Sequence, residues 1–213
     1  WLVARGARRL VLASRRGAWS PARKRAVEDL REAGAEVQVE ALDVADRPAL
    51  AELLGRLRTR GELRGVFHAA GVADVGLVVD QDRGRLEQVL RPKVSGAWNL
   101  HELTRQDPLD SFVLYSSVAS LLASPGQSTY AAANAFLDGL AWSRRAAGRP
   151  VTCVNWTAFE DGGMSLGDNP ERLRQTGMGT LRADQGARIL GRLMATGHPT
   201  SLVLPLDLGR WLD

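Results

Sequence analysis

The sequence has one cysteine, no run of eighteen apolar residues and no signal-peptide pattern at its start. A single cysteine excludes an internal disulfide, and Cys153 lies in the apolar run VTCVNW, which predicts a small buried side chain. The first residues, WLVARGARRL, lack the continuous apolar segment and small-residue cleavage site of a secreted protein. These absences predict a soluble cytoplasmic protein with no membrane partner.

The chain also lacks a strong charge of one sign. Its formal net charge is +4, and acidic residues are interleaved with basic ones, as in RKRAVEDLREAGAE at 23–36. No basic stripe carries interleaved aromatic residues, so we expect solvated helix faces and no nucleic-acid partner. Lysine is scarce, because Lys24 and Lys93 are the only two among 28 basic residues. A lysine in so arginine-rich a chain points to a place that needs a compact ammonium.

Short apolar runs alternate along the chain with longer segments of helical periodicity. The pattern predicts strands over 9–14, 35–43, 65–71, 111–117, 151–156 and 200–206. It predicts helices over 21–34, 48–61, 128–147 and 183–196, another inside 80–106, and an irregular stretch over 157–179. This alternation indicates an α/β fold, a doubly wound parallel sheet with helices on both faces. No repeat or linker divides residues 1–213, so a single domain is expected.

A glycine-rich phosphate loop is missing from this pattern. A nucleotide-binding fold of this class opens with a strand, a G-x-G-x-x-G turn and a helix, and no such motif occurs in the chain. The residues from Trp1 to Gly6 are predicted to end that first helix. The sequence is therefore expected to start after the phosphate loop.

Two strand ends carry residues suited to a dinucleotide. The first predicted strand ends at Ser14, Arg15 and Arg16, and arginine there can pair with a 2′-phosphate, which favours NADP(H) over NAD(H). The next strand ends at Asp43 and Val44, where a carboxylate and a backbone N–H could contact an adenine edge. Plainer alternatives remain for both: a charged turn in the first case and a cap on the following helix in the second.

The third predicted strand ends in HAAG, residues 68–71. Ala69, Ala70 and Gly71 are small enough for the backbone to approach a ligand closely. His68 is more simply a packed core histidine, since the other two histidines do not complete a metal-ligand spacing. No metal site is expected.

Four residues could carry chemistry: Lys93, Ser117, Tyr130 and Asn134. Ser117 ends the strand FVLYSS, and Tyr130 and Asn134 lie one turn apart on one face of the predicted helix. A tyrosine can act as a general acid toward a carbonyl oxygen if a nearby ammonium lowers its pKa, and a serine hydroxyl can stabilise the same oxygen. The residues alone leave open whether this helix presents a site or merely packs.

Four longer segments resemble the ketoreductase domain of modular type I polyketide synthases, a branch of the short-chain dehydrogenase/reductases. They are HAAG, RPKVSGAWNLHEL, FVLYSSVASLLASPGQSTYAAANAFLDGLAWSRR and NWTAFEDGGM. The resemblance covers the chain from Trp1 onward and implies a Rossmann-like fold. Ordinary members of the superfamily place the active-site lysine four residues after the tyrosine. Here Asn134 has that position and Lys93 lies upstream, as in the polyketide branch, with Ser117 before Tyr130 at the family's spacing.

The resemblance implies a role for each of the four residues. Tyr130 would donate a proton to a β-keto oxygen that Ser117 polarises. Lys93 would lower the pKa of the tyrosine and hold the nicotinamide ribose, and Asn134 would organise the water relay that reprotonates the tyrosine. NADPH would deliver hydride to the carbonyl carbon. The implied activity is reduction of a β-ketoacyl thioester to the β-hydroxyacyl thioester during polyketide chain elongation.

The implied partners are an acyl carrier protein that bears the β-ketoacyl phosphopantetheine thioester and neighbouring synthase domains, including a structural subdomain of the ketoreductase. Two alternatives stay open: a reductase-inactive scaffold and an α-epimerase of the same fold that uses the pocket without net reduction. The missing phosphate loop favours the scaffold. The complete set of four site residues favours the reductase.

The resemblance also implies a substrate side with a lid. The residues it assigns there are Leu122, Pro125, Phe159, Gly163 and Met164. A surface loop with glycines is the alternative for the lid. The configuration of the product hydroxyl stays open, because the family's Leu-Asp-Asp signature reads ADV at 73–75 and the tryptophan of the other stereochemical type is Leu122.

Overall fold

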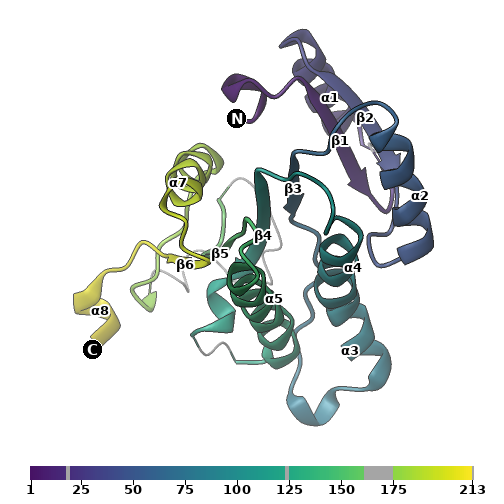
Figure 1. Cartoon of the computed structure of the whole chain (residues 1–213). Helices are drawn as coiled ribbons and strands as arrows, with labels where there is room; N and C mark the ends of the chain where they lie inside the picture. Colours follow the sequence, from purple (N-terminus) through teal and green to yellow (C-terminus); the bar gives the residue numbers. More distant parts are fainter. Residues whose placement is uncertain (18–19, 123–124, 161–174, 213) are drawn as a thin grey trace.

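The computed structural model describes residues 1–17, 20–122, 125–160 and 175–212, and within them strands and helices alternate (Figure 1). The strands are β1 (Arg9–Ser14), β2 (Glu36–Ala41), β3 (Gly65–His68), β4 (Ser111–Ser117), β5 (Thr152–Trp156) and β6 (Thr200–Val203). The α-helices are α1 (Pro21–Glu32), α2 (Arg47–Arg58), α3 (Arg83–Leu90), α4 (Gly96–Leu103), α5 (Ser128–Ala146), α7 (Ala183–Thr196) and α8 (Leu208–Leu212). Every element predicted from the sequence is present. Two features were not predicted: the division of 80–106 into α3 and α4, and the short α8.

The described strands form two parallel sheets, with β1 and β2 in one and β3, β4, β5 and β6, in that order, in the other. The α/β class with parallel strands is therefore confirmed. Among the described strands, β1 pairs only with β2 and β3 only with β4, so each has one unpaired edge. The apolar side chains of Val11 and Leu12 in β1 are 36% and 38% exposed.

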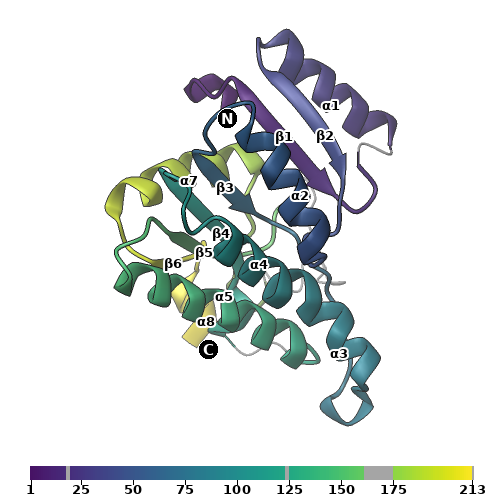
Figure 2. The same ribbon diagram turned by 45° about the vertical axis from the view of Figure 1, so that its right-hand side comes forward.

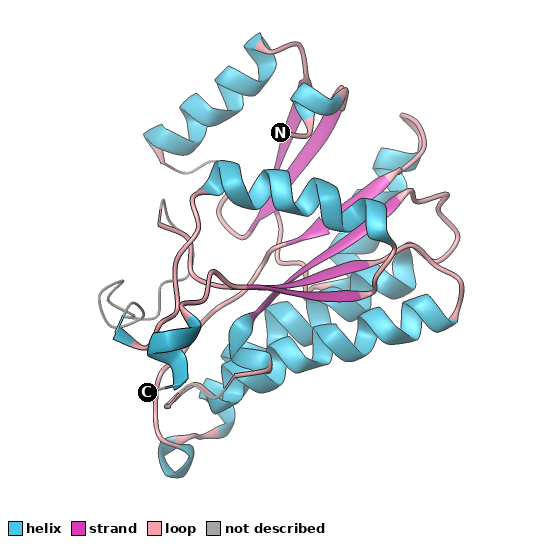
Figure 3. Cartoon of the chain, turned by 90° about the vertical axis from the view of Figure 1, so that its left-hand side faces the viewer, coloured by secondary structure: helices cyan, strands magenta, loops and turns pink. Residues whose placement is uncertain are grey.

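Helices cover both faces of the four-stranded sheet, which stands between them in Figure 3. On one face, Phe112 and Leu114 of β4 pack with Leu137 of α5. On the other face, Val113, the residue between them, packs with Leu190 of α7. This alternation follows from the twofold period of a strand, and it explains why FVLYSS is apolar at consecutive positions.

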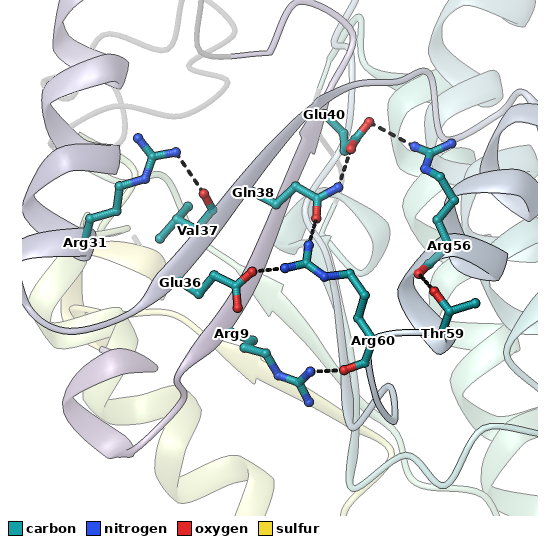
Figure 4. Close-up of polar contacts among 9 residues, drawn as sticks. All are labelled: Arg9, Arg31, Glu36, Val37, Gln38, Glu40, Arg56, Thr59 and Arg60. Carbon is teal, nitrogen blue, oxygen red and sulfur yellow. Dashed lines mark hydrogen bonds and ion pairs between the residues drawn. The ribbon is translucent and has the colours of Figure 1, made fainter.

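The smaller sheet has one apolar and one polar face, because the sequence EVQVEA of β2 alternates. Its valines pack with α1, which Figure 2 shows on the outer side of the sheet. On the other face, Glu36 and Gln38 contact the guanidinium of Arg60, and Glu40 pairs with Arg56 of α2 at 3.4 Å (Figure 4). Arginine pairs therefore replace apolar contacts on the side that faces α2.

The start of the chain is helical, as predicted: Val3–Arg5 forms a short 3-10 turn that ends at Gly6, whose φ of 100° suits glycine. No helix in the described part of the chain is long and apolar enough to cross a membrane.

A buried arginine fixes the end of α5 against the sheet. Arg144 is 1% exposed, and its guanidinium lies 3.6 Å from the centroid of the Phe112 ring. It donates to the Pro150 carbonyl from Nε (3.3 Å) and Nη2 (3.1 Å), while Nη1 lies 2.9 Å from His101 Nδ1. Burial lowers the pKa of Arg144 to about 10. His101 must accept this hydrogen bond, and burial together with the Arg144 charge lowers the pKa of His101 and keeps it neutral.

We expect Arg144→Ala to reduce the free energy of unfolding by at least about 2 kcal/mol, because the Pro150 carbonyl and His101 lose their donor in the interior. Arg145, the next residue of α5, is exposed and provides a matched control. Arg145→Ala should change the free energy by no more than about 0.5 kcal/mol. Urea unfolding of both variants measures the difference, and equal effects would contradict the structural role of Arg144.

Candidate active site

Ser117 and Tyr130 lie near each other at the carboxyl end of β4. Ser117 is the last residue of β4, and its Oγ accepts a hydrogen bond from Ala119 N at 3.2 Å. Tyr130 lies in the first turn of α5 and is 7% exposed. Burial raises the pKa of Tyr130, and the nearby side chains of Ser117 and Asn134 oppose this by lowering it. The phenol is therefore largely withdrawn from solvent, next to the half-buried Ser117.

Lys93 lies beside the Tyr130 ring, in a π-helical turn over Arg91–Ser95 that joins α3 to α4. Such turns are rare and are often found at functional sites. The side chain is 2% exposed, and Nζ donates to the Tyr115 carbonyl at 2.7 Å and lies 5.9 Å from the centroid of the Tyr130 ring. Burial lowers the pKa of Lys93 to about 8, although the nearby groups of Cys153 and Asp138 raise it. The lysine singled out by its scarcity is thus buried beside the tyrosine.

Asn134 is completely buried one turn after Tyr130 in α5. Its Nδ2 donates to the Tyr130 carbonyl at 2.8 Å, and Ser116 Oγ donates to the Asn134 carbonyl at 3.3 Å. Its Oδ1 has no hydrogen-bond partner among the described residues. A buried acceptor of this kind needs a donor, such as a water molecule, to be satisfied.

An open cavity of about 390 Å³ lies between the turn that follows Ser117 and the start of α5, although neither Ser117 nor Tyr130 lines it. It is lined mainly by apolar and small residues of three segments: 76–78, 119–122 and the start of α5. Gly76 N donates to Gly126 O at 2.9 Å, which links two of its walls. The segment before α3 is held by Arg85, which forms a bidentate pair with Asp74 at 2.7 and 2.9 Å. Leu122, predicted on the substrate side, lines this cavity.

A second, more polar cavity of about 240 Å³ lies at the ends of β1 and β2. It is lined by Arg15, Asp43, Gln88, Arg91 and Pro92. Arg15 has no acidic partner among the described residues, so its guanidinium can take an anion. Asp43 accepts from Ala45 N at 2.9 Å and from Arg91 Nε at 3.2 Å. The helix cap considered for Asp43 is instead made by Asp46, which accepts from Ala49 N at 3.1 Å.

The remaining residues predicted to hold a dinucleotide lie along the same edge. Ser14 Oγ donates to Gly17 O at 3.2 Å and closes the turn that presents Arg15 and Arg16. Val44 lies against α4, where a Cβ on Gly96 would come within 2.6 Å of its Cγ1.

The HAAG segment reaches this edge as well. Ala69 and Ala70 are exposed after the end of β3, and Gly71 follows them half-buried. His68 is 3% exposed, which agrees with a packed core histidine, and burial with the charge of Lys93 lowers its pKa to about 3.

Two residues of the predicted substrate side, Pro125 and Phe159, do not line the cavity. Pro125 is exposed and lies outside the cavity lining. The ring of Phe159 packs against Trp156, with centroids 5.4 Å apart, and fills the space above Gly186 of α7. Gly163 and Met164 lie outside the described residues.

Sequence reasoning missed Arg91 and the Asp74–Arg85 pair. Arg91 stands two residues before the lysine, so the segment RPK already contained a signal for it. The pairing of Asp74 with Arg85 joins residues eleven apart across an irregular segment, and no periodic pattern predicts it.

Known proteins with similar sequences agree with this geometry. Residues 1–161 match the family described as the KR domain. The phenolphthiocerol synthesis polyketide synthase type I Pks15/1 of Mycobacterium marinum is 44% identical over 97% of this chain and 10% of that protein. Pks1 of Mycobacterium tuberculosis, a synthase named as inactive, is 43% identical over 95% of the chain and 13% of that protein.

Solved structures agree too. A structure of A-type ketoreductases from a modular polyketide synthase superposes with a TM-score of 0.92 at 38% identity, over 99% of this chain and 45% of that one. The chain spans about a tenth of the length of the curated relatives and less than half of the solved structure. Sequence, fold and the arrangement of Lys93, Ser117, Tyr130 and Asn134 lead to one conclusion: the chain belongs to the KR domains, the ketoreductases of modular type I polyketide synthases.

Proposed function

We propose that this ketoreductase catalyses the NADPH-dependent reduction of a β-ketoacyl thioester, carried by an acyl carrier protein, to the β-hydroxyacyl thioester. The observation that carries the proposal is the burial of Lys93, Tyr130 and Asn134 together at the end of β4, with Lys93 Nζ 5.9 Å from the centroid of the Tyr130 ring and Ser117 as the last residue of that strand. Two hydroxyls aimed at one point can bind a single carbonyl oxygen. One of them, the phenol, is acidic enough to give up its proton as negative charge develops there.

Each of the four residues has a task in this scheme. Tyr130 Oη donates a proton to the keto oxygen, and Ser117 Oγ donates a hydrogen bond to the same oxygen. The ammonium of Lys93, close to the Tyr130 ring, stabilises the phenolate left behind. Asn134 Oδ1, buried and without a protein partner among the described residues, is placed to hold a water molecule that returns a proton.

The residues at the ends of β1, β2 and β3 fit a dinucleotide. When bound, NADPH supplies the hydride. Arg15 and Arg16 would hold its 2′-phosphate, Asp43 and Val44 its adenine, and Ala69, Ala70 and Gly71 would let the backbone approach it. The unpaired edges of β1 and β3, with Val11 exposed, are suited to a further parallel strand with a glycine-rich turn at its end. We include such a strand, from a polypeptide segment outside these 213 residues, in the proposed cofactor site.

The cavity beside the hydroxyl pair suits the acyl part of the substrate. Its lining includes Leu77, Val78, Leu121 and Leu122 and contains no charged side chain among the described residues. An apolar lining near the hydroxyls of Ser117 and Tyr130 suits an acyl chain that carries one keto group. The phosphopantetheine thioester of an acyl carrier protein is the partner proposed to bring it, within a synthase whose neighbouring domains include the structural subdomain.

A second function, a scaffold without reductase activity, is favoured by one observation. Pks1 of Mycobacterium tuberculosis, which is 43% identical to this chain, is named as inactive. The experiment below separates the two functions, since a scaffold oxidises no NADPH. An α-epimerase would exchange the α-hydrogen of the substrate without consuming cofactor.

The two tyrosines of the chain provide a matched test of the proton donor. We expect Tyr130→Phe to lower kcat for a β-ketoacyl thioester about a hundredfold or more, because the general acid is lost. Tyr115→Phe removes the other phenol, keeps the carbonyl that binds Lys93, and should retain most activity. NADPH oxidation by the natural polypeptide that carries the chain measures both. Equal kcat for Tyr130→Phe and wild type would refute the proton donor, and no oxidation by wild type would favour the scaffold.

Arg15 should determine the choice between the two nicotinamide cofactors. We expect Arg15→Ala to raise the KM for NADPH about tenfold to a hundredfold, the effect of one charge-assisted hydrogen bond, and to leave the KM for NADH nearly unchanged. Arg25→Ala, an exposed arginine in α1, is the control and should change neither constant. A parallel rise of both constants in Arg15→Ala would show that the arginine does not read the 2′-phosphate.

A further inference from the structure

In the part of the chain that the structure describes, the carboxylate of Asp138 has no arginine or lysine hydrogen-bonded to it. Asp138 is in α5, two turns after Tyr130, and it accepts three side-chain hydrogen bonds in the described structure. Its Oδ2 accepts from Ser120 Oγ at 2.8 Å and from Asn155 Nδ2 at 3.0 Å. Its Oδ1 accepts from Cys153 Sγ at 3.2 Å. The donors come from different parts of the chain, so one side chain connects the turn after β4, strand β5 and helix α5.

Asn155 strengthens this connection, because it bridges Asp138 and Ser120. It is 1% exposed in β5, and its Nδ2 also donates to Ser120 Oγ at 2.5 Å. Ser120 Oγ lies 3.0 Å from the Ser117 carbonyl, so the serine is within reach of the backbone that carries the reacting hydroxyl. The Ser120 hydroxyl can donate its one proton either to Asp138 Oδ2 at 2.8 Å or to the Ser117 carbonyl at 3.0 Å, and the shorter distance favours the carboxylate. Ser120, Asn155 and Asp138 thus form a closed triangle against the turn that begins at Ser117.

An ionised carboxylate suits this place, since it is an acceptor at both oxygens. Two donors converge on Oδ2 and a thiol donates to Oδ1. The charged and titratable groups near it are Lys93 in the π turn and Cys153 in β5. The negative charge of Asp138 raises the pKa of both, which agrees with its lying within electrostatic reach of the ammonium below Tyr130.

We propose that Asp138 is a positioning residue that holds the Ser117 turn against α5, so that the Ser117 and Tyr130 hydroxyls converge on one oxygen atom. Its side chain does not line the cavity beside them, and it acts through Ser120 and Asn155. The inference rests on the proposed function for its kinetic consequence. Its structural part, the fixed contact between Ser117 and Tyr130, can be tested without any substrate.

The kinetic test compares two replacements of Asp138 in the natural polypeptide that carries the chain. Asp138→Asn keeps an oxygen acceptor toward Ser120 and Asn155, whereas Asp138→Ala leaves both donors unsatisfied. We expect Asp138→Ala to lower kcat about tenfold to a hundredfold with little change in KM, and Asp138→Asn to retain most activity. Ser120→Ala, which removes one corner of the triangle at low cost to folding, should give an intermediate loss. Glu87→Ala, an exposed acid of α3, is the control.

The structural test reads the pKa of Tyr130 directly. Fluorotyrosine incorporated site-specifically at position 130, through a suppressed stop codon, gives a single ¹⁹F resonance to follow with pH. Loss of the carboxylate charge alone would lower the pKa of a nearby phenol. Loss of the influence of the nearby Ser117 side chain, which lowers this pKa, would raise it. We therefore expect a rise in Asp138→Ala and no rise in Asp138→Asn.

The outcomes separate the two proposals. Equal falls of the Tyr130 pKa in both variants, or an unchanged kcat in a folded Asp138→Ala, would overturn the positioning role. A wild-type protein that oxidises no NADPH would overturn the proposed function, and the ¹⁹F titration would still decide whether Asp138 fixes the Ser117–Tyr130 contact.

Discussion

A buried ammonium must donate to an oxygen atom, and Lys93 finds its acceptor in the carbonyl of Tyr115 within β4. The segment from Arg83 to Leu103 does not form one continuous α-helix. The π turn at Arg91–Ser95 widens it at the point where Lys93 points inward. The same turn packs against α5, and this contact places Lys93 next to Tyr130. It also presents Arg91 to the polar cavity, two residues before Lys93 faces Tyr130. One irregular turn thus connects the proposed cofactor side of the site with its reacting centre.

The sequence predicted the order and type of the elements well, because alternating apolar runs and helical periods are local signals. It also predicted which residues gather around Tyr130, since the resemblance assigned Lys93, Ser117 and Asn134, and the structure brings them together. Three features escaped it for physical reasons. The π turn leaves no mark in the period of RPKVS, the exposure of β1 depends on how strands pair, and the Asp138 triangle links residues 17 and 18 positions apart.

The site has two sides of different chemistry that meet at the end of β4. One side is apolar, with the segments 76–78 and 119–122 around the cavity. The other side has the exposed guanidinium of Arg15 and the ion pair of Asp43 with Arg91. Between them lie Tyr130, which is buried, and Ser117, which is half-buried at the end of β4. The apolar cavity is therefore suited to the apolar part of a ligand, and the polar cavity to its charged part.

The arginine pairs on β2 have a consequence for how the chain holds together. The four-stranded sheet is joined to its helices by apolar packing, whereas one face of β2 is joined by Arg56 to α2 and by Arg60 to the turn that follows this helix. Dissolved ions screen contacts between half-exposed charges and leave buried apolar contacts almost unchanged. The arginine pairs on β2 and the buried surroundings of Lys93 and Tyr130 thus respond differently to the medium: raising the ionic strength weakens the first and leaves the second almost unchanged.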